Sequence, residues 1–360
     1  MAPAIAGRAS LSGHTFMANL NLSPIGLSIA AVMSVANVFT DVARKKALAG
    51  RSLIPATFWC KAFTAVVFGA MLLLRIAQGS PLVIRDGGNL FGLARIHLSP
   101  VPTFGIYLLI DILLVSVANL LYFLALQVSP MSLCVPFLAF TPIFLIPTGF
   151  VMLGELPAPL KLAGVALIVV GSLVMHRRLF AVGWMAPVQA IVKEPGSRYM
   201  LMVACIFSVT NPLEKKLVLM SDIYIQAFAF GLGLCIFLFI LAMVKKEDFV
   251  AAVRKNLPWV VTAGVGDGVA LLLQLAAYRY IDVVITVSIK RAGIVLSVFS
   301  GWLFFRERGI TDKVIAASVM FAGVLILYLP LTAMQVGVMT ILTLIAMSFA
   351  LRFTRGQPVR

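Results

Sequence analysis

Residues 125–174 read ALQVSPMSLCVPFLAFTPIFLIPTGFVMLGELPAPLKLAGVALIVVGSLV, and residues 276–326 read AAYRYIDVVITVSIKRAGIVLSVFSGWLFFRERGITDKVIAASVMFAGVLI. A shift of 152 positions pairs Glu155 with Glu307 and Lys161 with Lys313. Chance explains matching Val and Ala in apolar sequence, but it explains poorly an acid and a base repeated at equal spacing. The two stretches are therefore predicted to be copies of one unit.

The front of each unit also repeats, at a different offset. A shift of 170 positions places the pair Lys45 and Lys46 on Lys215 and Lys216. The two offsets differ by 18, which is about the length of the connection at residues 80–100. One insertion in the first unit therefore accounts for both offsets.

The composition predicts a membrane protein. The chain is 61% hydrophobic and 12% charged, against about 45–50% and about 25% in soluble domains. Many apolar runs are near the length of about 20 residues that crosses a bilayer as a helix. Ten spans are predicted, at residues 24–43, 53–76, 104–127, 130–153, 160–176, 199–218, 223–244, 258–280, 283–305 and 313–330.

Each unit contains five of these spans, and an odd number reverses the direction of the chain. The expected fold is an all-α membrane protein of ten transmembrane helices, arranged as two inverted five-helix repeats at 24–176 and 199–330. Inverted repeats with a site near the midplane recur in secondary transporters. A further apolar run, 332–351, either spans the membrane as an eleventh helix or lies against the bundle.

The quoted stretches resemble EamA-type domains of the drug/metabolite transporter superfamily, over roughly residues 24–330. The segments NVFTDVARKKAL (37–48) and SVTNPLEKKLVL (208–219) resemble the first helices of the two copies. The shared signature is small-xx-Pro, then Gly-Glu or Arg-Glu, then a Gly-rich final helix. The resemblance implies ten helices and a central cavity that opens alternately to each side, but it implies no substrate.

The most unusual charges are Lys290 and Arg291, in the apolar segment SIKRAG (288–293). A charge at the centre of a membrane helix costs at least about 2.5–3.5 kcal/mol and usually faces the protein interior. The shift of 152 positions relates them to Leu138 and Ala139, so only the second unit carries charges at these positions. Either the pair binds substrate or it forms a structural ion pair. Adjacent helix residues point about 100° apart, so one is expected to face a neighbouring helix.

The organic-phosphate translocators of plastids, in the same superfamily, carry a Lys-Arg pair in this helix, and this similarity favours an anionic substrate. Asp267 and Asp111 are expected to pair with these cations or to carry a proton, with a helix cap as the alternative for Asp267. Polar residues in mid-helix are expected to line the cavity, although helix–helix hydrogen bonds would explain them almost as well. These residues are Asn37, Asp41, Asn119, Tyr122, Asn211, Glu214 and Gln274.

The net charge of +16 comes mostly from Lys and Arg between the apolar runs, which is usual in membrane proteins and argues against a nucleic-acid partner. Arg44 is assigned to such a connection, after the first span. Lys215 and Lys216 are expected to be anchors at the membrane interface. Glu155 is expected to cap the helix that follows it.

No nucleotide-binding loop, nucleophile elbow or metal-ligand spacing occurs in the sequence, so neither a cofactor nor an enzyme activity is expected. The favoured function is secondary active transport of a small polar metabolite, with an anion as one option, across the inner or plasma membrane. Its expected partners are the substrate, the lipid bilayer, and either H⁺ or a counter-substrate. The alternatives are an organic-phosphate or nucleotide-sugar exchanger and, from another class, a membrane-embedded lipid-modifying enzyme. The oligomeric state is left open.

Overall fold

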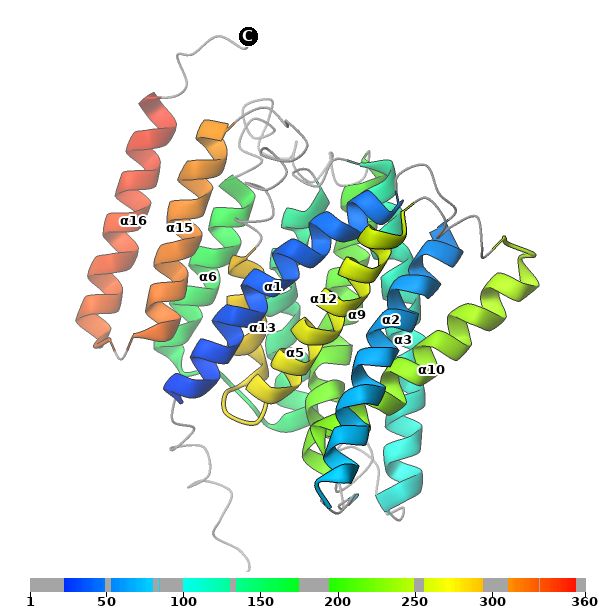
Figure 1. The fold of residues 1–360 in the computed structure, drawn as a ribbon. Helices are drawn as coiled ribbons and strands as arrows, with labels where there is room; N and C mark the ends of the chain where they lie inside the picture. The colour runs from blue at the N-terminus through cyan, green and yellow to red at the C-terminus, as the bar shows by residue number, and fades with distance from the viewer. Residues whose placement is uncertain are drawn as a thin grey trace, which may run out of the picture.

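A computed structural model describes residues 23–48, 53–79, 84, 100–129, 134–174, 194–248, 256–293, 310–329 and 331–353. These parts of the chain are helical and contain no strand (Figure 1). The helices are α1 Pro24–Leu48, α2 Leu53–Ala77, α3 Pro100–Val128, the 3-10 helix η3 Val135–Phe140, α5 Thr141–Leu153, α6 Pro159–Val174, α9 Pro195–Met220, α10 Ile223–Val244, α12 Leu257–Ala277, α13 Val283–Ala292, α15 Ile310–Tyr328 and α16 Ala333–Phe353.

Five of the described helices are long and apolar enough to cross a membrane: α1, α2, α3, α10 and α12. Shorter apolar stretches lie in α5, α6, α15 and α16. Many large apolar side chains on these helices are exposed, among them Phe39, Leu73 and Ile240. Such a surface suits lipid, because water would penalise large contiguous apolar areas.

The main helix contacts join segments that are distant in the sequence. α1 packs along α12, α3 along α9, α2 along α10, and α6 along α15. In Figure 1, α6, α15 and α16 form one edge of the bundle, while α2, α3 and α10 form the opposite edge. α1, α5, α9, α12 and α13 lie between these two groups.

The contact between α6 and α15 depends on two glycines. A Cβ atom added to Gly323 would lie 2.7 Å from the carbonyl oxygen of Gly164, and one added to Gly164 would lie 2.7 Å from that of Gly323. The two backbones therefore touch at this point, as small residues permit in membrane helices. Lys161 reinforces the same contact, since its Nζ donates to the carbonyl oxygens of Ile326, Leu327 and Leu329 at 2.9–3.0 Å.

Some predicted spans differ from the observed helices. The fourth span begins as η3 and continues as α5, which contains Pro142 and Pro147. α1 runs five residues beyond its predicted end, so Arg44 lies inside the helix and not in a connection. α13 ends at Ala292, and the rest of the predicted ninth span lies outside the described residues. The run at 332–351 is a helix, α16, packed against α6 and α15.

Candidate functional site

A cavity of about 100 Å³ lies among helices from both halves of the chain. All but one of the predicted site residues line it: Asn37, Asp41, Asn119, Tyr122, Asn211, Glu214, Asp267, Gln274, Lys290 and Arg291. The exception is Asp111. The cavity is therefore the candidate binding site, and its polar residues fall into two networks.

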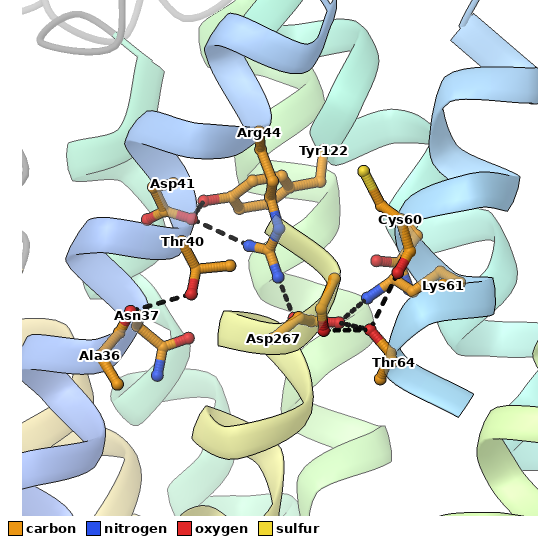
Figure 2. A network of polar contacts seen from close by, with 12 residues as sticks. Ala36, Asn37, Thr40, Asp41, Arg44, Cys60, Lys61, Thr64, Tyr122 and Asp267 are labelled. Atoms are coloured by element: carbon orange, nitrogen blue, oxygen red, sulfur yellow. Dashed lines mark hydrogen bonds and ion pairs between the residues drawn. The ribbon is translucent and has the colours of Figure 1, made fainter. Parts of the chain in front are cut away.

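The first network joins α1, α2, α3 and α12 (Figure 2). Arg44 lies at its centre, where its Nη1 is 2.8 Å from Asp41 Oδ1 and its Nη2 contacts Asp267 Oδ1. Lys61 forms an ion pair with the other oxygen of Asp267, Oδ2. Tyr122 donates a hydrogen bond of 2.7 Å from its hydroxyl to Asp41 Oδ1.

These contacts give each buried charge a counter-charge. Asp41, Arg44 and Lys61 are each less than a tenth exposed. Buried charges without a partner are costly, and paired ones are tolerated. The Arg44 guanidinium also lies 5.3 Å from the centre of the Tyr122 ring, which adds a cation–π contact. The first network is therefore electrostatically satisfied without a ligand.

Asp267 has different partners from those expected. The sequence assigned it to Lys290 or Arg291, but its carboxylate pairs with Arg44 and Lys61. The reason is helix packing, because α12 lies against α1 and α2 over much of its length. The assignment of Arg44 to a connection is wrong for the same reason, since its part of α1 is buried against α12.

The second network joins α9, α12 and α13 through the amide of Gln274. Its Nε2 is 2.9 Å from Glu214 Oε2, 3.1 Å from Asn211 Oδ1 and 2.8 Å from the Tyr278 hydroxyl. Its Oε1 accepts a hydrogen bond of 2.6 Å from Lys290 Nζ. The Tyr278 hydroxyl donates in turn to Asn211 Oδ1 at 2.9 Å. One neutral amide thus connects the cation Lys290 with the carboxylate of Glu214.

Lys290 and Arg291 are the cations that this part of the protein does not neutralise. Among the described residues, neither forms an ion pair with a carboxylate. The Arg291 guanidinium lies 5.6 Å from the centre of the Phe207 ring, and its buried Nε has no hydrogen-bond partner. Both residues line the cavity, and Lys290 also donates to Gln274 of the neighbouring helix α12, so one residue combines the two expected roles.

The end of α13 explains how two cations are accommodated there. Both residues lie in its last turn, where the unpaired carbonyl groups of a helix favour positive charge. Ser34 of α1 donates from its hydroxyl to the carbonyl oxygen of Ile289 at 3.1 Å, which ties this turn to α1. A helix that ends beside the cavity therefore presents both cations to it.

Asp111 does not line the cavity. It is fully buried in α3, and neither of its carboxylate oxygens has a hydrogen-bond partner. The prediction that it contacts substrate is therefore not supported by its position. The amides of Asn37 and Asn119 do line the cavity, and both donate to their own helix, to Met33 O at 2.9 Å and Val115 O at 2.8 Å.

Sequence reasoning missed Arg44, Ser34 and Phe207 as cavity residues. Lys61, a charge within an apolar run, is a further cavity residue that was not placed in the site. A signal for Arg44 was present, because it lies three residues after Asp41 and is related to Glu214 by the shift of 170. Ser34 and Phe207 carry no signal in an apolar helix, since many equivalent residues there face lipid.

A third polar cluster lies at the start of α13. Lys215 Nζ is 2.6 Å from Glu155 Oε1 and donates to Ile281 O at 2.9 Å, so Lys215 is a buried partner and not an interfacial anchor. Glu155 Oε2 accepts from the backbone N–H of Val283 at 3.1 Å. Glu155 therefore caps α13, and the expectation that it caps the helix following it is wrong. Burial and the nearby Glu155 raise the pKa of Asp282 to about 6.

The class of protein follows from comparison with known families. Residues 195–329, from α9 to α15, match the model of the EamA-like transporter family, part of the drug/metabolite transporter superfamily. This part of the chain is thus similar to an EamA-like transporter domain, in agreement with the resemblance stated for the second half. Together with the apolar helices, this match indicates a multi-pass integral membrane protein.

No curated protein matches the chain. Among the solved structures that match, one titled "Crystal structure of protein" aligns with a TM-score of 0.61 and 17% sequence identity. The alignment covers 85% of this chain and 98% of that chain. It shows a shared fold over most of the molecule.

Proposed function

We propose that the protein is a secondary active transporter that moves a small polar, anionic metabolite across the cell membrane, inner or plasma, by alternating access. The observation that carries this proposal is the pair Lys290 and Arg291, which line the cavity without a carboxylate partner among the described residues. A transport role accords with the family match over residues 195–329.

The charges of the cavity wall favour an anion. Its cations are Arg44, Lys61, Lys290 and Arg291, and its acids are Asp41, Glu214 and Asp267. Arg44 and Lys61 are already paired with Asp41 and Asp267. Lys290 faces the remaining acid, Glu214, only through the neutral amide of Gln274. One net positive charge is therefore left at Lys290 and Arg291, where an anionic group would gain charge-assisted hydrogen bonds.

The arrangement of helices supports ten spans in two inverted repeats, which we propose as 24–176 and 199–330. The first helix of each half packs on the third helix of the other, α1 on α12 and α9 on α3. Likewise, the first helix of each half packs on the fourth span of the other half, α1 on α13 and α9 on α5. Two repeats that interlock in this way enclose a site between them and allow rocking around it.

The size of the cavity bears on the alternative, an exchanger of organic phosphates or nucleotide-sugars. A volume of about 100 Å³ accommodates a small anion better than a nucleotide-sugar. Drug-sized ligands occupy pockets of roughly 300–1,000 Å³. We therefore favour a small carboxylate or phosphate. A membrane enzyme is disfavoured because the interior acids Asp41 and Asp267 are held by cations.

Counterflow in proteoliposomes with labelled organic anions, amino acids and sugars tests the proposal. We expect uptake of an anion, with a loss of at least tenfold in the double variant Lys290→Gln, Arg291→Gln, since each charged hydrogen bond is worth about 1.5–3 kcal/mol. Lys245→Gln, exposed at the end of α10, is the matched control. Unchanged uptake in the double variant would remove the binding role of this pair.

A further inference from the structure

The interior carboxylates of the described helices differ in their partners. Asp41 contacts Arg44 and Tyr122, and Asp267 contacts Arg44 and Lys61. Glu214 accepts one hydrogen bond, from the neutral amide of Gln274, and Asp111 accepts none. Glu214 and Asp111 are thus the two acids without a cation in contact.

These two acids are close to each other. Asp111 lies on α3 and Glu214 on α9, and the two helices pack together. Tyr107, one turn before Asp111, shares an apolar cluster with Leu213, next to Glu214. Asp111 is near enough to Glu214 for the two carboxylates to interact electrostatically. Two carboxylates that share a buried site do not both ionise at low cost, so such pairs retain a proton.

Among the described residues, no lysine or arginine forms an ion pair with either acid. The ammonium of Lys216 on α9 lies 4.8 Å from the centre of the Tyr107 ring. Within the described part of the chain, α5, α10 and η3, which pack on α9, contain no Asp, Glu, Lys or Arg. Lys215, the neighbour of Glu214, is engaged by Glu155. Tyr278 lies nearby, but its hydroxyl is held by Gln274 and Asn211. Lys61 and Asp267 act on Glu214 from a distance and are paired with each other.

The cation that balances Glu214 is Lys290, and the connection runs through Gln274. The Gln274 amide accepts from Lys290 at 2.6 Å and donates to Glu214 at 2.9 Å. A ligand anion that binds Lys290 would pair with its ammonium charge, which now reaches Glu214 through Gln274. Glu214 would then lie beside Asp111 with no counter-charge, and an added proton relieves that cost.

We infer that Glu214 and Asp111 form a proton site coupled to the anion site, and that a proton crosses the membrane together with the substrate. The inference rests on the proposed function and names its coupling ion. The charges balance for a dianion such as succinate or sulfate: Lys290, Arg291 and ionised Glu214 leave one positive charge in the empty site, and both cations, neutral Glu214 and the dianion sum to zero. The proton comes from the water on the side to which the cavity opens and leaves on the other side.

Coupling of this kind is reciprocal, so a proton strengthens anion binding by the same factor as the anion strengthens proton binding. The first test is calorimetric titration of the purified full-length protein with succinate and with sulfate, in buffers of different ionisation enthalpy. Net proton uptake is expected on binding, and it should be lost in Glu214→Gln. Asp248→Asn, in the exposed turn after α10, is the control that keeps the uptake.

The second test needs no ligand. The infrared spectrum of the empty protein at neutral pH should contain a carboxylic acid band that disappears in Asp111→Asn and persists in Asp248→Asn. Absence of that band in the wild type overturns the paired-acid site. Binding of succinate or sulfate without proton uptake overturns the coupling and leaves the anion site intact. If neither anion binds, the anion site fails and the coupling fails with it.

Discussion

At the scale of single residues, Asp267 decides how the cavity wall is held together. Its two carboxylate oxygens contact two different cations, Arg44 from α1 and Lys61 from α2. Removing one partner of a buried ion pair leaves an uncompensated charge, which is more damaging than replacing the whole pair. The stability of this region should therefore depend on the balance of charge more than on the number of contacts.

We expect Asp267→Asn to lower the free energy of unfolding by about 3–5 kcal/mol, the usual cost of breaking a buried pair. Lys61→Met added to that variant should recover part of the loss, because it removes one unpaired cation. Thermal unfolding in detergent measures both. If the double variant were no more stable than Asp267→Asn alone, charge balance would not be the reason.

The ionisation of Asp282 should make the stability of the protein depend on pH. Its pKa in the folded protein is about 6, above the ordinary value of 3.8, because of burial and the neighbouring Glu155. The folded state then binds the proton more tightly than the unfolded state, so this group costs stability as the pH rises from about 4 to about 6. Asp282→Asn should stabilise the protein at neutral pH by about 1–3 kcal/mol, at about 1.4 kcal/mol per pKa unit.

That stabilisation should shrink toward pH 4, where the aspartate is protonated in the folded protein. The Asp282 side chain makes no capping hydrogen bond to α13, so the asparagine removes no such contact. Unfolding midpoints of the variant and the wild type across this pH range measure the difference. A constant difference at every pH would contradict the assigned titration.

At the scale of helices, the close contact between α6 and α15, which we call the seam, depends on Gly164 and Gly323. The carbonyl oxygen of Gly164 would lie 2.7 Å from a Cβ on residue 323, so a methyl group there must push the helices apart. We expect Gly323→Ala to destabilise the protein by about 1–3 kcal/mol, the range for overpacking. Gly105→Ala is the matched control, because a Cβ there meets no atom within 4 Å. Thermal unfolding compares the two, and equal midpoints would exclude a tight seam.

Lys161 acts on the same seam by a different mechanism. Its ammonium group satisfies three carbonyl oxygens near the end of α15, which would otherwise lack donors inside the membrane protein. Lys161→Met keeps most of the side-chain volume and removes the donors. We expect a loss of about 1–3 kcal/mol, the cost of leaving buried acceptors unsatisfied. Unfolding of Lys161→Met measures it, and a midpoint equal to that of the wild type would mean that water replaces the lysine.

At the scale of the whole molecule, α16 stands apart from the cavity. Among the described helices it packs mainly on α6 and α15, and much of its apolar surface is exposed. A chain that ends after Leu331 should therefore keep the substrate selectivity of counterflow uptake and lose only modest stability. Loss of all uptake from a truncated protein that still elutes as a folded species would show that α16 contributes to transport.

The two halves of the chain that the sequence shift relates differ in charge. The shift of 170 places Asp41 on Asn211 and Arg44 on Glu214, so the first helices of the two halves carry opposite charges at the corresponding position. In the structure Arg44 is neutralised by two aspartates, whereas Glu214 contacts a neutral amide. Arg44 therefore has its counter-charges within the protein, whereas Glu214 has no cation in contact among the described residues.

The sequence alone determined the helical membrane class and most of the polar residues of the cavity. It did so because the cost of polar and charged groups in lipid places them in the interior. It could not determine which charges meet. Asp267 pairs with Arg44 and Lys61, Lys215 with Glu155, and Lys290 with Gln274, across separations of 16 to 223 residues. Only the packing of the helices decides those pairings, because an ion pair depends on distance and direction in space.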